Sequence, residues 1–266
     1  MLIKLLKYEF KATGRIMFPV YAASIIMGLI SSIVFNYRTY INFSENSLFT
    51  VSSLIIFTLF FCLITAAVVL SFVISILRFK KNLLDNEGYL MNTLPVTTAQ
   101  NISAKLITAV FYQILSVIVA CLAGIVLFVG STETTIADII KGIPHILYYT
   151  ANHITNGGLL VLLELIVLSL FSLILLNTEM YTAMSIGHSA NSHKVIKSVA
   201  AYIIIYIIQN IIGTLLILPI VVKNSAANVQ GMPASLLLLF IAVDIVYFII
   251  YFIITNYFMK KRLNLQ

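Results

Sequence analysis

Six long runs of apolar residues, almost free of charge, constrain this chain more than any other feature. A helix needs about 20 apolar residues to cross a bilayer core of about 30 Å. Strands of a membrane barrel would alternate instead in segments of about 10 residues, and these unbroken runs do not. We therefore predict an all-α integral membrane protein with six spanning helices at about residues 16–35, 48–77, 106–129, 157–181, 198–222 and 234–259.

The composition excludes a soluble fold. Of the 266 residues, 61% are hydrophobic and 9% are charged, whereas soluble domains average about 45 to 50% apolar and about 25% charged residues. Too few polar side chains remain to form a shell against water, so lipid must surround the apolar surface. We expect residues 1–266 to form a single transmembrane domain.

The basic residues predict which side each end faces, because cytosolic flanks retain Lys and Arg during insertion. Only three basic residues, Arg38, Lys141 and Lys223, fall on one side. We expect both termini in the cytosol, and we expect the basic rings to contact lipid headgroups instead of nucleic acid. The cytosolic set comprises Lys4, Lys7, Lys11, Arg15, Arg78, Lys80, Lys81, Lys105, Lys194, Lys197, Lys260, Lys261 and Arg262.

Residues 1–15 have the pattern of an interfacial helix. Lys4, Lys7, Lys11 and Arg15 recur at helical spacing, with Leu2, Leu6 and Phe10 on the opposite side. Such a helix is either a simple membrane anchor or an elbow that couples the first span to a neighbouring subunit.

The cytosolic segment 78–105, between spans two and three, has its own internal structure. Leu83, Leu84, Leu90 and Met91 are spaced for one side of a short surface helix, which ends at Leu94 and Pro95 because a residue before proline leaves the helical region. Thr97 and Gln100 then form a T-x-x-Q capping box that begins the next helix. The segment is either an ordinary amphipathic loop or a docking site for a cytosolic partner.

Four polar residues stand out inside the predicted spans, two acids and two amides. Glu164 and Asp244 are acids, for which burial at the bilayer centre costs about 2.5 to 3.5 kcal/mol on insertion scales, and Gln209 and Asn210 lie near the middle of span five. Counted from the outer ends at about 1.5 Å per residue, Glu164 lies about 10 Å deep and Asp244 about 15 Å deep. These residues either line a route for a polar or cationic substrate or hydrogen-bond between helices.

Two further segments carry weaker patterns. His188 and His193 lack a third ligand for a metal, so we interpret them as solvated loop histidines. On the outer side, the recurrence of Ile136, Ile139, Ile140 and Ile143 in 130–156 predicts a surface helix that caps the bundle or gates its outer mouth.

Two stretches resemble the permease subunit of a type-2 ATP-binding-cassette exporter in its small bacterial form. Residues 87–106, EGYLMNTLPVTTAQNISAKL, are similar to the family's acidic-Gly-Tyr-Leu, Thr-Leu-Pro and Lys-Leu pattern before span three. Residues 179–198, EMYTAMSIGHSANSHKVIKS, are similar to its Ser-Ile-Gly exit from span four and basic entry to span five. The chain departs from the family before its last span, where 223–233 is short, so no extracellular gate is inferred.

The resemblance implies a multi-pass protein of the bacterial cell membrane that forms a homodimer or heterodimer of permeases, with a cytosolic ATPase docked beneath each copy. ATP and Mg²⁺ would be bound by that ATPase, and this chain would be no enzyme and hold no cofactor. A coupling helix would receive the docking, and the cargo would be a peptide, an antibiotic or a lipid. The docking residues implied are Asp85, Glu87, Gly88, Tyr89, Leu94 and Pro95.

Two other classes share the six-helix pattern. An intramembrane enzyme needs paired catalytic groups at one depth, and H-E-x-x-H is absent from the sequence, which leaves Glu164 with Asp244 as the one candidate pair. A passive immunity or sensor protein would have the same fold and no ATPase. If the chain is part of an exporter, the ATPase must be another chain, because the sequence contains no G-x-x-x-x-G-K-[ST] phosphate loop.

Overall fold

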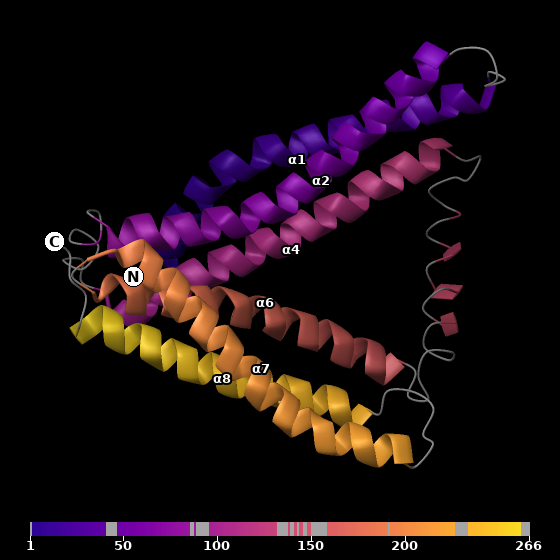
Figure 1. Ribbon diagram of the computed structural model, residues 1–266. Coiled ribbons are helices and arrows are strands. Elements are labelled where there is room, and N and C mark those ends of the chain that lie inside the picture. Colours follow the sequence, from indigo (N-terminus) through magenta and orange to yellow (C-terminus); the bar gives the residue numbers. More distant parts are fainter. Residues whose placement is uncertain are drawn as a thin grey trace. The chain divides into compact units, whose positions relative to one another are not determined.

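A computed structural model describes residues 2–40, 47–85, 88, 96–131, 138, 141–142, 144–145, 148–149, 159–190, 192–226 and 234–261 (Figure 1). Within these residues the regular structure is helical throughout. The elements are α1 (Leu2–Tyr40), α2 (Ser47–Phe79), the π-helical turn η1 (Lys80–Leu84), α4 (Thr98–Ser131), α6 (Leu159–His188), α7 (Lys194–Ala226) and α8 (Ala234–Lys261).

Six of the described helices are long and apolar enough to cross a membrane. The prediction of six apolar helices is confirmed, and the chain has the architecture of a multi-pass membrane protein. Which end faces the cytosol stays a prediction. The candidate spans are Leu2–Phe35, Thr50–Leu84, Thr98–Val129, Leu160–His188, Lys194–Pro219 and Leu236–Lys261.

The chain divides into two compact units, and each is described by itself. Unit 1 holds residues 1–75 and 107–142, and unit 2 holds residues 76–106 and 143–266. The division falls within α2 and α4, so each of these helices contributes to both units.

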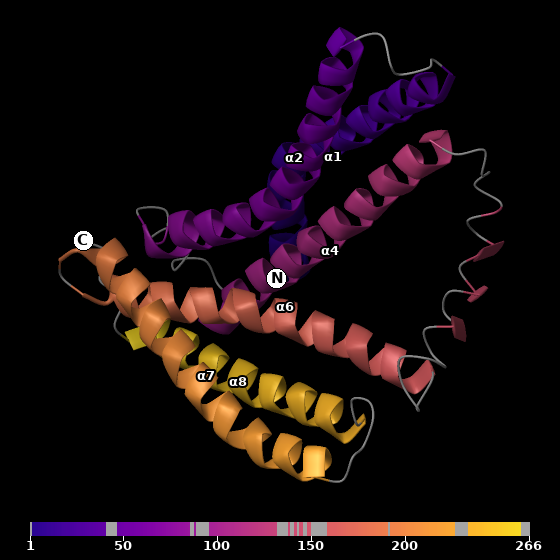
Figure 2. The same cartoon turned by 45° about the vertical axis from the view of Figure 1, so that its right-hand side comes forward.

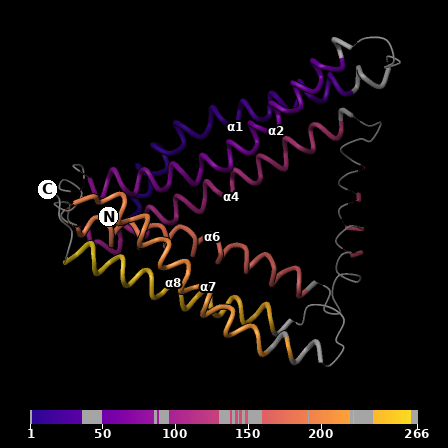
Figure 3. Tube along the Cα trace, in the orientation of Figure 1, coloured from indigo at the N-terminus to yellow at the C-terminus, as the bar shows by residue number. Residues whose placement is uncertain are grey.

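In unit 1, α1 runs beside α2 and α4 (Figure 3). Buried side chains from these three helices form a small core. Met17 of α1, Ala67 of α2 and Tyr112 of α4 belong to this core. The hydroxyl of Tyr21 donates to the backbone oxygen of Tyr112 at 2.9 Å and lies 2.8 Å from the hydroxyl oxygen of Ser116. Polar bonds between apolar helices supply the specific contacts that apolar faces alone do not supply in lipid.

The predicted boundary between an interfacial helix at 1–15 and a span from residue 16 is absent from the structure, because α1 runs unbroken from Leu2 to Tyr40. The intervening Gly14 costs only about 1 kcal/mol in a helix, which does not suffice to break it. Lys4, Lys7, Lys11 and Arg15 are exposed, as the spacing predicts. The opposite face differs from the prediction, because it also buries Glu9 and Thr13.

In unit 2, α6 packs against both α7 and α8, and Figure 2 shows the three helices running alongside one another. The contact of α6 with α8 includes a polar seam. The hydroxyls of Thr182 and Thr255 lie 2.9 Å apart, and the Thr182 hydroxyl also lies 3.1 Å from the Tyr251 backbone oxygen. These bonds help to fix the register of the two helices.

Candidate functional site

The end of α2 is anchored on α6 by two buried rings. Phe79 and Tyr181 are 0% and 1% exposed, and their rings stack with centroids 3.9 Å apart. α2 does not end near residue 77, as predicted, because the chain continues as the π-helical turn η1 to Leu84. The apolar Leu83 and Leu84 are fully buried there, so packing extends the helix past the basic residues that mark the end of the apolar run.

Asp85 follows η1 and lies beside the last residue of α6. Its amide donates to the Lys80 backbone oxygen at 3.0 Å, and its backbone oxygen accepts from the Gly88 amide at 2.8 Å. One Asp85 carboxylate oxygen lies 3.9 Å from Nε2 of His188. The Asp85 side chain is 46% exposed, whereas that of His188 is 3% exposed, so Asp85 is the member of the pair that a partner can reach.

The interpretation of His188 as a solvated loop residue is wrong. α6 extends to residue 188, past the predicted end near 181, and His188 is buried with its Nδ1 3.0 Å from the backbone oxygen of Met184. His193 is exposed, in the turn before α7. The described residues contain no group of three His, Cys, Asp or Glu side chains that could hold a metal ion.

The turn between α6 and α7 depends on a glycine. A Cβ atom at Gly187 would collide with the backbone and hydroxyl of Ser198 on α7. Only glycine therefore permits this close approach of the two helices.

α4 begins at the predicted capping box. The Thr97 amide donates to Oε1 of Gln100 at 3.1 Å, and the Gln100 amide donates to the Thr97 hydroxyl oxygen at 3.2 Å. This reciprocal pair satisfies two amides that no carbonyl of the helix can reach. The next residue, Thr98, donates to Oδ1 of Asn256 on α8 at 2.5 Å. The start of α4 is thus tied to the end of α8.

We use the term connector for residues 78–105, and the structure describes it only in part. Among the docking residues implied by the resemblance, Asp85 is exposed and Gly88 is buried. Glu87, Tyr89, Leu94 and Pro95 lie outside the described residues. Ile136, Ile139, Ile140 and Ile143 of the predicted outer helix also lie outside them.

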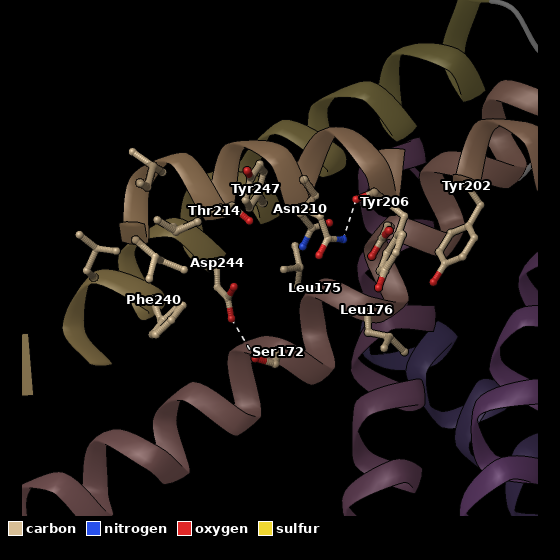
Figure 4. A pocket seen from close by; sticks show the side chains of 17 residues that line it. Ser172, Leu175, Leu176, Tyr202, Tyr206, Asn210, Thr214, Phe240, Asp244 and Tyr247 are labelled. Atoms are coloured by element: carbon tan, nitrogen blue, oxygen red, sulfur yellow. Dashed lines mark hydrogen bonds between the residues drawn. The ribbon is translucent and has the colours of Figure 1, made fainter. Parts of the chain in front are cut away.

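A cavity of about 430 Å³ lies between α6, α7 and α8, entirely within unit 2. Three of the four predicted intramembrane polar residues line it, namely Asp244, Gln209 and Asn210. Figure 4 shows side chains from all three helices converging on this space. The other lining residues are Ser172, Leu175, Leu176, Glu179, Tyr202, Tyr206, Gly213, Thr214, Leu216, Ile217, Leu239, Phe240, Val243 and Tyr247.

Hydrogen bonds hold the polar groups of the cavity in place. The Ser172 hydroxyl of α6 donates to the Asp244 carboxylate at 2.9 Å, as Figure 4 shows. Gln209 of α7 accepts from the Tyr251 hydroxyl of α8 at 3.2 Å. The amide nitrogen of Asn210 donates to the Tyr206 backbone oxygen at 2.8 Å. The cavity is thus a partly organised polar site inside an apolar bundle.

Glu179 is the cavity residue that sequence reasoning missed. It is 6% exposed, and its Oε1 has no hydrogen-bond partner in the described part of the chain. Glu179 lies two residues before the predicted end of span four, at the cytosolic exit, so the sequence pattern does not mark it as an intramembrane polar residue. Its spacing carries the missing signal, because Glu179 lies seven residues after Ser172 and therefore on the same face of α6.

Glu164 lies apart from this site and does not line the cavity. Asp244 bonds to Ser172, and eight residues separate Ser172 from Glu164 on α6, or about 12 Å along the axis. The predicted neighbouring depths are therefore wrong, because counting inward assumes that both helices start at one level. Oε2 of Glu164 is buried with no hydrogen-bond partner among the described residues.

The cavity and the contacts of the connector involve the same helices of unit 2. A cavity with a few oriented polar groups among apolar walls is typical of ligand sites. The contacts from the connector to α6 and α8 reach two of the three helices that form the cavity.

No family model, no curated protein and no solved structure matches this chain.

Proposed function

We propose that this chain is the transmembrane subunit of an ATP-binding-cassette exporter of the type-2 class, driven by a separate cytosolic ATPase. The observation that carries the proposal is the contact between the connector and the end of α6. Each region holds one of the two stretches that resemble the family. Asp85 and Phe79, which precede the stretch 87–106 within the connector, contact His188 and Tyr181 of the stretch 179–198.

The contacts support a mechanical role for the connector. On its α2 side, the buried stack of Phe79 on Tyr181 couples it to α6. On its α4 side, the bond from Thr98 to Asn256 couples it to α8. A push on the connector from an ATPase would therefore move α6 and α8, which line the cavity, and packed interfaces of this kind shift as discrete elements.

The proposal includes the partners that the class requires. The ATPase would bind ATP and Mg²⁺, dock against the segment that holds Asp85, Glu87, Gly88 and Tyr89, and close on ATP binding. A second permease copy or a paralogue would complete the transporter. The large apolar side chains that α7 leaves exposed, such as Ile204 and Leu215, suit lipid or that second permease.

The cavity supplies the start of a route for cargo. Asp244, Gln209 and Asn210 provide polar contacts within the cavity, and Glu179 adds a second acid. Peptides, antibiotics and lipids all combine polar and apolar groups, which suits the mixed lining. The proposed location is the bacterial cell membrane.

An intramembrane enzyme fits the described geometry less well. Glu164 and Asp244 were the one candidate catalytic pair, and Glu164 does not line the cavity that holds Asp244. General acid and base groups must lie within hydrogen-bond reach of one substrate. A passive immunity or sensor protein remains the second candidate, and copurification of an ATPase separates it from the exporter.

The proposal is tested by a photo-crosslinking amino acid at Asp85, with the same label at the outer residue Asp138 as a matched control. The tagged chain is purified from its native membrane in mild detergent, and ATP hydrolysis by the eluate is measured. We expect Asp85 alone to crosslink to a protein with a phosphate-loop motif and the eluate to hydrolyse ATP. Crosslinks from Asp85 only to lipid, with no ATPase activity, would contradict the proposal.

A further inference from the structure

The cavity between α6, α7 and α8 carries acidic groups and no basic ones. Glu179 and Asp244 are its acids, and none of its 17 lining residues is Lys, Arg or His. A carboxylate in a bilayer is costly unless a counter-charge or a donor satisfies it. The electrostatic complement of this cavity is therefore positive.

Glu179 provides an unfilled acceptor in this cavity. Its side chain is more than nine-tenths buried, and its Oε1 lacks a hydrogen-bond partner within the described residues. Buried polar atoms in folded proteins nearly always have a partner. A ligand in the cavity that donates a hydrogen bond or brings a positive charge would satisfy this atom.

Tyrosine rings provide a second feature that favours cations. Tyr202 and Tyr206 lie one turn apart on α7, with ring centroids 6.3 Å apart, and Tyr247 lines the cavity from α8 (Figure 4). The face of a tyrosine ring attracts a cation within about 6 Å. Phe240 and several leucines complete a lining that suits an apolar body.

The size of the cavity indicates what kind of cation fits. A volume of about 430 Å³ falls in the range of about 300 to 1,000 Å³ of small-molecule sites. It is far larger than a bare metal ion. The combination of an unfilled acid, a second acid, ring faces and apolar walls describes an organic ion that carries its charge on a hydrophobic body.

We propose that this cavity binds a hydrophobic organic cation, with Glu179 and Asp244 as its anionic contacts and the tyrosine rings against its body. As a binding site the cavity stands on its own geometry. As the identity of the cargo, the inference rests on the exporter function proposed above.

The test measures binding to the purified full chain in an uncharged detergent, without an ATPase, by equilibrium dialysis. The probes are tetraphenylphosphonium and tetraphenylborate, which have nearly the same shape and opposite charge. We expect saturable binding of the cation and at least tenfold weaker binding of the anion, after subtraction of uptake by detergent alone. Absence of saturable cation binding, or equal affinity for the two ions, would overturn the inference.

Variants locate the site. Glu179→Gln and Asp244→Asn should each weaken cation binding at least tenfold, because each removes one of the charges that face the ligand. Asp138→Asn removes a charge from an exposed residue that does not line the cavity, and its affinity should equal that of the unaltered chain. Unchanged affinity in Glu179→Gln would overturn the inference. If that variant does not fold, the comparison of the two ions decides.

The outcome is separable from that of the exporter proposal. An absence of cation binding, in a chain that still couples to an ATPase, would refute the cation site and leave the exporter intact. Cation binding by a chain that never associates with an ATPase would support the site and contradict the exporter.

Discussion

The ring of Phe79 lies flat on the ring of Tyr181, with an interplanar angle of 6° and 3.9 Å between their centroids. Phe79 is the last residue of α2, and Tyr181 lies in the last third of α6. Both rings are fully buried. This stack joins the entry to the connector to a helix that lines the cavity.

We expect Phe79→Ala to lower the stability of the chain by about 3 kcal/mol, because removal of a buried aromatic ring costs about 3 to 5 kcal/mol. Thermal unfolding in detergent measures the effect. Phe61→Ala is the matched control, since Phe61 is a phenylalanine of α2 that is 61% exposed. Equal melting temperatures for the two variants would show that the stack does not stabilise the fold.

Gly187→Ala should destabilise the turn between α6 and α7. The added methyl group would collide with the backbone of Ser198, so one helix must shift. Gly124→Ala is the control, because a Cβ atom at Gly124 meets nothing within 4 Å and alanine favours helix by about 1 kcal/mol. Melting temperatures should fall for Gly187→Ala and stay level or rise for Gly124→Ala. The reverse order would contradict this packing.

Loss of the capping box should loosen the start of α4. Thr97→Ala removes the oxygen that accepts from the Gln100 amide, at a cost of about 1 kcal/mol. Hydrogen exchange should speed up at the first turn of α4, about fivefold or more, and should be close to normal in Thr97→Ser, which keeps the hydroxyl. Identical exchange in all three chains would show that the box does not protect this turn.

The helices and the start of α4 could be predicted from the sequence, because local sequence patterns determine them. Uninterrupted apolar runs identify the six helices, and T-x-x-Q identifies the start of α4. Contacts between residues that are distant in the sequence could not be predicted from it. The extension of α2 through η1, the burial of His188 and the bond from Thr98 to Asn256 all depend on packing between helices.

The cavity was predictable only in part, for the same reason. Three of its polar residues stand out as costly groups within apolar runs. Glu179 stands at the edge of its run, where an acid is common, so only the register of α6 assigns it to the cavity. Glu164 stands out equally in the sequence, yet the register places it about 12 Å from the level of Asp244.

Within the connector, Glu87→Ala or Tyr89→Ala should abolish coupled ATP hydrolysis while membrane insertion stays normal. Both residues belong to the implied docking segment, which follows directly on the exposed Asp85. ATP hydrolysis by the reconstituted complex, with and without cargo, measures the coupling. Normal coupling in both variants would count against docking at this segment.

The central claim is that a separate ATPase exerts force on the membrane helices through the connector. Its most direct test is an electron cryomicroscopy map of the complex purified from its native membrane without added nucleotide. The account predicts an ATPase in contact with Asp85 and the residues that follow it. A map in which this segment contacts only lipid and solvent would contradict the account.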